Sequence, residues 1–211
     1  ANYHSHTPRC RHASGTEAEY AENALRRGLK IFGFSDHTPQ FFPGDYYSFM
    51  RMYPNELEDY CQTVRSLQKA YRGQIELPLG LEAEYYPDIW PELLPRLQDA
   101  GIEYLILGQH WLGNEQGEHG SSGATADEKL LRCYCRQVME ALETEKFTNI
   151  STAGICGNSA RPPSRRIFLW KSICLEFSKE STIPTRRSGP SRRRKAARPS
   201  WAWTPTPLTK F

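Results

Sequence analysis

Short apolar runs alternate with amphipathic segments along the first 150 residues of this chain. Apolar residues dominate 31–34, 75–81 and 102–108, and runs of this length between turn residues are typical of buried strands. Between them, apolar positions recur every three or four residues, as in a helix with one buried face. Helices are expected at residues 17–27, 56–72, 90–100 and 127–145. This alternation predicts an α/β fold with a parallel sheet or barrel.

Residue types at the helix ends support two of these boundaries. Thr16 followed by Glu19 is a capping-box pattern, in which each side chain bonds to the other residue's backbone N–H. Gly28 is expected to end this first helix, since glycine readily adopts the backbone conformation found after a helix. Asn55, with Glu58 three positions on, is expected to cap the second helix in the same way.

Residues that can bind metals occur where the strands are expected to end. His4 and His6 lie two positions apart on an extended segment, so their side chains point to the same face. The three apolar runs lead into His37, Glu82 and His110. Imidazole and carboxylate groups bind zinc, iron and manganese, and parallel α/β folds place their chemistry at the carboxyl ends of strands. A single histidine after a strand is usually structural, but four successive segments that end this way predict a shared metal centre.

Five short motifs carry these candidate ligands. They are Tyr-His-Ser-His at 3–6, Arg-Cys-Arg-His at 9–12, Gly-Phe-Ser-Asp-His-Thr-Pro at 33–39, Gly-Leu-Glu-Ala-Glu-Tyr at 80–85 and Gly-Gln-His-Trp at 108–111. Over about residues 2–148 the chain resembles the polymerase-and-histidinol-phosphatase (PHP) superfamily, and within it the histidinol-phosphatase branch. The resemblance implies a distorted (β/α)7 barrel with a trinuclear metal site. This chain would form that barrel incompletely, with an irregular or disordered C-terminal part.

The resemblance also implies which residues hold the first two metal ions. His4 and His6 would bind the first ion. Glu82 would bridge the first and second ions, and His110 would join it at the second. Glu82 and His110 are therefore the residues expected to act directly in catalysis.

The remaining candidates have an implied role or an open alternative. His12 and His37 would share the third metal ion of the family pattern. Arg51, in the loop after His37, is a candidate for binding the substrate phosphate through two parallel hydrogen bonds. It is equally well interpreted as a solvated loop arginine. Asp36 is expected either to support His37 or to cap a turn.

The function implied by the resemblance is metal-dependent hydrolysis of a phosphate monoester. In the histidinol-phosphatase branch the substrate is L-histidinol phosphate, a small molecule of histidine biosynthesis, and the products are L-histidinol and phosphate. The cofactors would be zinc, manganese or iron ions, up to three per site. Two alternatives stay open, namely a PHP-type nuclease or other phosphoesterase, and a non-enzymatic binding protein with a basic tail.

Charge divides the chain near residue 150. Residues 1–150 hold 22 of the 24 Asp and Glu residues, whereas residues 151–211 hold 13 of the 27 Lys and Arg residues. A basic tail of this kind is typical of disordered arms that bind nucleic acids. We nevertheless expect no nucleic-acid partner, because the acidic part contains the sequence patterns of an ordered fold. Residues 1–150 are thus predicted to form the PHP-type part, and residues 151–211 a poorly ordered tail.

The genetic code suggests an origin for this tail. Tryptophan has a single codon, and a frame shifted by two nucleotides makes residues 201–210 compatible with Gly-Val-Asp-Ala-His-Thr-Pro-Asp-Gln-Val. That string resembles the last metal-binding motif of the superfamily, an Asp-x-His pattern. We therefore predict that the chain is a frame-shifted translation from a point between Thr148 and Leu169 onward, with impaired activity. No histidine follows His119 in the sequence as it stands.

Cysteine usage and hydropathy indicate the compartment. The six cysteines show no spacing typical of a disulfide framework, and no apolar run reaches the length of a membrane span. We expect no secretory signal, no membrane partner and a cytoplasmic location. The sequence leaves the oligomeric state open.

Overall fold

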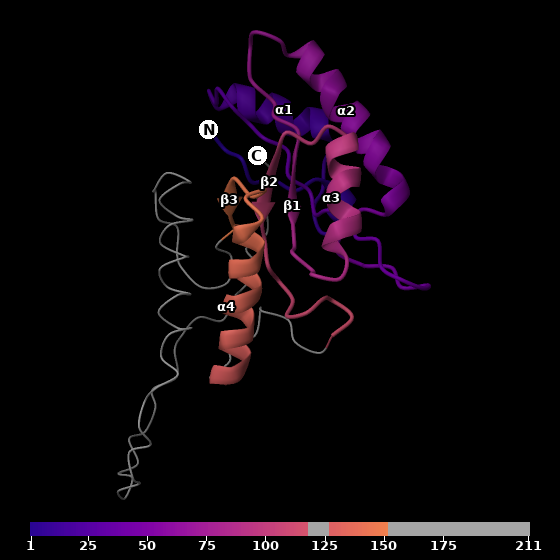
Figure 1. Cartoon of the computed structure of the whole chain (residues 1–211). Coiled ribbons are helices and arrows are strands. Elements are labelled where there is room, and N and C mark those ends of the chain that lie inside the picture. Colours follow the sequence, from indigo (N-terminus) through magenta and orange to yellow (C-terminus); the bar gives the residue numbers. More distant parts are fainter. Residues whose placement is uncertain (118–126, 152–211) are drawn as a thin grey trace, which may run out of the picture. The chain divides into compact units, whose positions relative to one another are not determined.

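A parallel sheet forms the centre of the computed structural model, which describes residues 1–117 and 127–151 (Figure 1). Its three strands are β1 (Gly80–Ala83), β2 (Tyr104–Leu107) and β3 (Asn149–Ile150), hydrogen-bonded in that order. Both strand pairs are parallel. The carboxyl ends of these strands therefore meet at one edge of the sheet.

Two more extended segments continue the sheet beyond β1 through isolated parallel bridges. His37 pairs with Glu82, which places the segment 31–37 beside β1. Asn2 pairs in turn with Phe32, which places the N-terminal segment next to that one. The described residues therefore hold five parallel segments side by side, in the order in which they occur along the chain.

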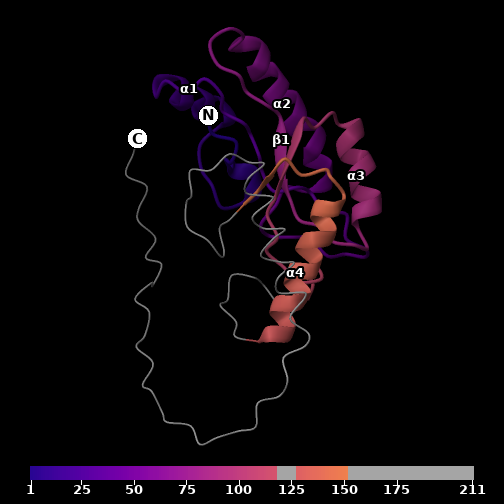
Figure 2. The same cartoon turned by 60° about the vertical axis from the view of Figure 1, so that its left-hand side comes forward.

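Along the chain, one α-helix connects each of these segments to the next, as expected for a barrel of alternating strands and helices. The helices are α1 (Glu17–Arg26), α2 (Leu57–Ala70), α3 (Trp90–Asp99) and α4 (Glu128–Glu143). Helices α1 and α2 contact each other, and α2 and α3 lie close to β1 in both views (Figure 2). The apolar side chains of these helices and of the sheet form one core. The predicted α/β fold class is confirmed.

The helix boundaries test the two capping predictions. Thr16 caps α1, with both hydrogen bonds of the capping box formed to Glu19. The prediction for Asn55 is wrong, because Pro54–Glu56 form a 3-10 turn that leads directly into α2. Proline fixes its backbone angle φ near the helical value, so the turn begins before Asn55 could act as a cap.

Tyr104, the first residue of β2, joins three of the five segments. Its hydroxyl lies 2.8 Å from the carbonyl oxygen of Tyr3 and 2.9 Å from that of Phe34, and can donate to either. Its ring covers Gly33 and Gly80, where any Cβ atom would collide with the ring. Both positions therefore need glycine because of close packing, not because of a turn.

We expect Tyr104→Phe to lower the free energy of unfolding by about 1 kcal/mol, because the one hydrogen bond that the hydroxyl donates is lost while the ring stays in place. Gly80→Ala should cost about 1–3 kcal/mol through overpacking. Urea denaturation monitored by circular dichroism measures both. Tyr71→Phe is the matched control, since that hydroxyl makes only a 3.4 Å contact with Glu22. Equal stability of the two Tyr→Phe variants would contradict the role of Tyr104.

Several predictions fall outside the described residues. These are the predictions of a poorly ordered tail at 151–211, of which only Ser151 is described, and of a shifted reading frame. The domain boundary near residue 150 therefore stays a prediction. Among the helices of the described part, none is both long and apolar enough to cross a membrane.

Candidate metal centre

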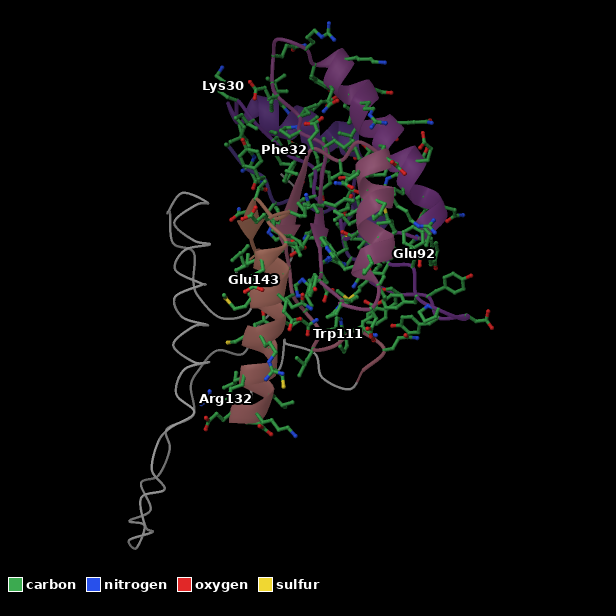
Figure 3. The ribbon with its side chains drawn as sticks, viewed as in Figure 1. Lys30, Phe32, Glu92, Trp111, Arg132 and Glu143 are labelled. Atoms are coloured by element: carbon green, nitrogen blue, oxygen red, sulfur yellow. The ribbon has the colours of Figure 1, made fainter. Side chains whose placement is uncertain are left out.

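Four parallel segments carry candidate ligands at their carboxyl ends. In Figure 3, Lys30 and Phe32, at the start of the second segment, lie at the opposite end of the sheet from Trp111, which follows β2. His110 directly precedes Trp111 and marks the ligand-bearing edge. The other candidates at this edge are His4 and His6 on the first segment, His37 on the second and Glu82 on β1.

Glu82 lies at the centre of four imidazole rings. Its Oε2 atom is 3.1 Å from His4 Nε2 and 3.2 Å from His6 Nε2. The same oxygen is 3.4 Å from His37 Nδ1, and Oε1 is 3.5 Å from His110 Nε2. Glu82 is only 1% exposed, so water does not surround this carboxylate. The structure thus brings together five of the six side chains predicted as ligands from the sequence.

Hydrogen bonds explain only part of these contacts, such as the one between His4 Nε2 and Glu82 Oε2. Nδ1 of His37, Oε1 of Glu82 and Nε2 of His110 are buried without a hydrogen-bond partner. Buried polar atoms are nearly always paired, so unpaired ones that face each other indicate a cation site. Four ligand atoms about 2.0–2.1 Å from one zinc ion lie roughly 3.3 Å apart in a tetrahedron. The separations of 3.1–3.5 Å observed here are close to that value, so these residues fit a divalent metal ion.

His12, the sixth candidate, lies beside this cluster. Its Nδ1 atom is 2.7 Å from the carbonyl oxygen of Cys10, so Nδ1 carries the proton and Nε2 keeps a free lone pair. The His12 ring centroid is 5.2 Å from that of His6 and 5.3 Å from that of His37. The spacing of ligand atoms groups His12 with His6 and Cys10. The family pattern, which assigns His12 and His37 to one ion, stays a prediction.

Burial and mutual contact set the charges of these groups. Burial favours a raised pKa for Glu82, but the contacts with His110, His4 and His6 outweigh it and hold that pKa well below its usual range. Burial lowers the pKa of His37 to about 2. Burial also acts to lower the pKa of His110, but the contact with Glu82 outweighs it and raises that pKa. At neutral pH Glu82 is therefore an anion and His37 a neutral imidazole, the forms in which they bind cations.

Asp36 fixes the chain directly after His6. This fully buried carboxylate accepts hydrogen bonds from the backbone N–H of Thr7 at 2.6 Å and from the Thr7 hydroxyl at 2.5 Å. Of the two roles expected for Asp36, the contacts favour the holding of a turn over direct support of His37. The turn in question begins with the 3-10 segment Pro8–Cys10, for which Thr7 is the N-cap.

Glu84 holds the loop that carries His110. Its Oε2 atom accepts hydrogen bonds from the backbone N–H groups of His110 at 3.0 Å and Trp111 at 3.1 Å. Its Oε1 atom accepts one from Arg51 at 2.8 Å. Glu84 is not among the site residues predicted from the sequence. The sequence does contain a signal for Glu84. In a Glu-x-Glu pattern at the end of a strand, the two carboxylates point to the same face, so Glu84 shares the face of Glu82.

Arg51 lies inside the protein and not on a solvated loop. It is 1% exposed, and its guanidinium donates to Glu84 at 2.8 Å and to Glu115 at 2.5 Å. It also donates to the carbonyl oxygen of Thr38 and to the hydroxyl of Ser48, both at 3.2 Å. With these donors engaged, Arg51 does not offer the free pair of N–H groups that bidentate phosphate binding needs. We interpret it as the internal counter-ion that joins three loops.

The position of Glu82 requires glycine at residue 108. A Cβ atom there would collide with the Glu82 side chain. We expect Gly108→Ala to displace this carboxylate and to weaken zinc binding by about 10- to 100-fold, the range for residues that orient metal ligands. Calorimetric titration with zinc measures the change. Gly117→Ala is the control, since the nearest atom to its Cβ would be the Asn114 carbonyl oxygen at 3.2 Å. Equal zinc affinities of the two variants would contradict this assignment.

Similarity to known proteins agrees with this geometry. A protein of Deinococcus radiodurans named "Probable histidinol-phosphatase" is 36% identical over 110 residues, covering 52% of this chain and 42% of the relative. The histidinol-phosphatase of Bacillus subtilis is 34% identical over 115 residues, covering 52% of this chain and 43% of the relative. The matched part therefore spans less than half the length of these curated relatives.

The fold and the family are shown by two further matches. The crystal structure of histidinol phosphate phosphatase from Lactococcus lactis, complexed with zinc, L-histidinol and phosphate, aligns with a TM-score of 0.56 at 18% identity. That alignment covers 82% of this chain and 68% of the solved one, and it shows a shared fold. The family model described as "PHP domain" matches residues 2–161, most of the chain. On this evidence, the chain belongs to the PHP domain family.

Proposed function

We propose that this protein is a metal-dependent phosphate monoester hydrolase that converts L-histidinol phosphate and water to L-histidinol and phosphate. The observation that carries the proposal is the buried Glu82 carboxylate with imidazole nitrogens of His4, His6, His37 and His110 within 3.5 Å. The names of the two curated relatives, and the ligands of the solved structure from Lactococcus lactis, support this choice of substrate.

The described side chains offer places for more than one divalent ion. His4, His6 and Glu82 would hold one ion, and His37, Glu82 and His110 would hold another, since the ligand atoms of each group lie within 4.8 Å of one another. A third ion would use His12. Divalent ions bound at such a site lower the pKa of a coordinated water and polarise a phosphoryl group.

The protein's own groups prepare the site for this chemistry. Glu82 serves both groups of ligands, so one buried negative charge offsets part of the charge of two cations. His37 stays neutral because of its burial, and its lone pair remains available. Glu84 fixes the backbone at His110, which limits the motion of that imidazole during binding.

The C-terminal part bears on how active this chain is. The family resemblance implies a further histidine after the strand near residue 150, and an Asp and a His in a final motif. All six histidines of this sequence precede residue 120. We therefore propose that turnover is impaired relative to an intact relative. Sequencing of the encoding DNA tests the shifted frame, and a shifted frame without an open Asp-x-His motif would refute it.

The proposed function is tested by phosphate release from L-histidinol phosphate with added manganese or zinc. We expect release that a chelator abolishes, at a rate below that of a full-length relative and above that of the chain with Glu82→Gln. A rate equal to that of the variant would contradict the proposal. Faster cleavage of single-stranded DNA than of the phosphate ester would favour the alternative of a PHP-type nuclease.

A further inference from the structure

One side chain of α4 holds the loop that follows β2. Gln137 lies on the buried face of this helix and is 6% exposed. Its Oε1 atom accepts a hydrogen bond from the backbone N–H of Gly113 at 2.8 Å, and its Nε2 atom donates to the carbonyl oxygen of Gly113 at 3.1 Å. The same Nε2 atom donates to the carbonyl oxygen of Tyr85 at 2.7 Å. The amide of Gln137 therefore joins α4 to two loops, those after β1 and β2.

This set of bonds requires a carboxamide. Gly113 presents one donor and one acceptor to Gln137, and Tyr85 presents a second acceptor, so the side chain must supply two N–H groups and an oxygen. The backbone of Gly113 has a φ angle of 77°, in the left-handed region that favours glycine. At position 137, glutamate would keep the acceptor and lose both donors, whereas methionine would lose all three bonds with little change in size.

The backbone of Tyr85 connects Gln137 to the residues around His110. The carbonyl oxygen of Tyr85 accepts the hydrogen bond from Gln137, and its N–H donates to Oε1 of Gln109 at 2.9 Å. Gln109 directly precedes His110, and its Nε2 atom donates to the carbonyl oxygen of Trp111 at 2.7 Å. The residues on both sides of His110 are thus tied to the backbone that Gln137 holds.

The imidazole of His110 depends on this backbone for its position. Its Nε2 atom is buried without a hydrogen-bond partner. Among the described residues, none accepts a hydrogen bond from Nδ1 of His110, whereas the carbonyl oxygen of Cys10 fixes Nδ1 of His12. Metal-binding histidines are usually oriented by such an acceptor at the second ring nitrogen. A displacement of the loop would therefore move the His110 ligand atom directly.

We propose that Gln137 is a positioning residue for His110, through which α4 sets the affinity and the coordination geometry of the ion that His110 would bind. Glu84 anchors the backbone N–H of His110, and Gln137 anchors Gly113, so both ends of the segment 110–113 are fixed. Gln137 is not a member of any candidate ligand group in the described residues, so its effect passes through the loop. This inference rests on the proposed function and extends it from the metal ligands to the helix that holds one of them.

Metal binding by the full chain tests the inference without a measurement of activity. Gln137→Glu should weaken zinc binding by about tenfold in a calorimetric titration, the lower end of the range for groups that orient metal ligands. It should also change the visible absorption spectrum of the protein saturated with Co²⁺, because that spectrum depends on coordination geometry. Gln137→Met, which adds no charge, should have both effects. Gln98→Glu is the matched control, because Gln98 is exposed on α3, and it should have neither.

Leu142→Ala separates positioning from a general loss of packing by α4. Leu142 is 4% exposed in the core of the same helix, so its truncation should lower the urea midpoint and leave the cobalt spectrum unchanged. The same spectral change in Leu142→Ala, or equal spectra and zinc affinities of Gln137→Glu and Gln98→Glu, would overturn the inference. The expected variant effects in a parent chain that releases no phosphate from L-histidinol phosphate would refute the proposed function and leave the role of Gln137 standing.

Discussion

Glu82→Gln is expected to abolish catalysis and to remove most of the bound metal. The substitution keeps the size of the side chain and removes its charge. Glu82 supplies the carboxylate of two candidate ligand groups, one with His4 and His6 and the other with His37 and His110. Without that charge, the imidazoles of His4, His6, His37 and His110 would have to hold two cations alone. We expect the rate of phosphate release to fall about a thousandfold, which corresponds to roughly 4 kcal/mol of barrier.

Metal content by mass spectrometry and phosphate release from L-histidinol phosphate measure this effect together. Glu76→Gln is the matched control, because Glu76 is an exposed residue at the other end of the same extended run. It should leave both quantities unchanged. If Glu82→Gln retained the metal content and the rate of the parent chain, the assignment of the metal centre would have to be abandoned.

Arg51→Met is expected to lower the free energy of unfolding by about 3–5 kcal/mol, the range found when one partner of a buried ion pair is removed. The variant would leave Glu84 and Glu115 buried without their shared counter-ion. Since Glu84 also holds the backbone at His110 and Trp111, the loop after β2 should loosen with it. Metal binding is therefore expected to weaken as well.

Urea denaturation of the metal-free chain measures the stability change without a contribution from metal affinity. Arg26→Met is the control, because Arg26 is exposed on α1 and its hydrogen bond goes to Asn23 on the same helix. It should cost less than about 0.5 kcal/mol. If the two variants had similar free energies of unfolding, Arg51 would be a solvated loop arginine, which is one of the two interpretations that the sequence left open.

Local sequence patterns were sufficient to predict the alternation of strands and helices. Apolar runs between turn residues predicted the extended segments at 31–37, β1 and β2, and Thr16 with Glu19 predicted the start of α1. The prediction failed at Asn55, where a neighbouring proline set the backbone before the capping residue could act. Both outcomes depend on residues within a few positions of each other, which is the range over which sequence patterns carry information.

The sequence by itself determined that His4, His6, His37, Glu82 and His110 end successive strands. Parallel strands have their carboxyl ends at one edge, so side chains at those ends must gather there whatever the loops do. This is why the grouping could be predicted without coordinates.

Only the tertiary structure decided the surroundings of that group. Arg51, Glu84 and Glu115 come from three separate loops and form ion pairs in the interior, and the sequence had left Arg51 open between phosphate binding and solvent exposure. Glu115 lies in a polar, glycine-rich stretch that carries no strand or helix pattern to show which way it points. Loop conformation depends on long-range packing and desolvation, and no local periodicity encodes either of these.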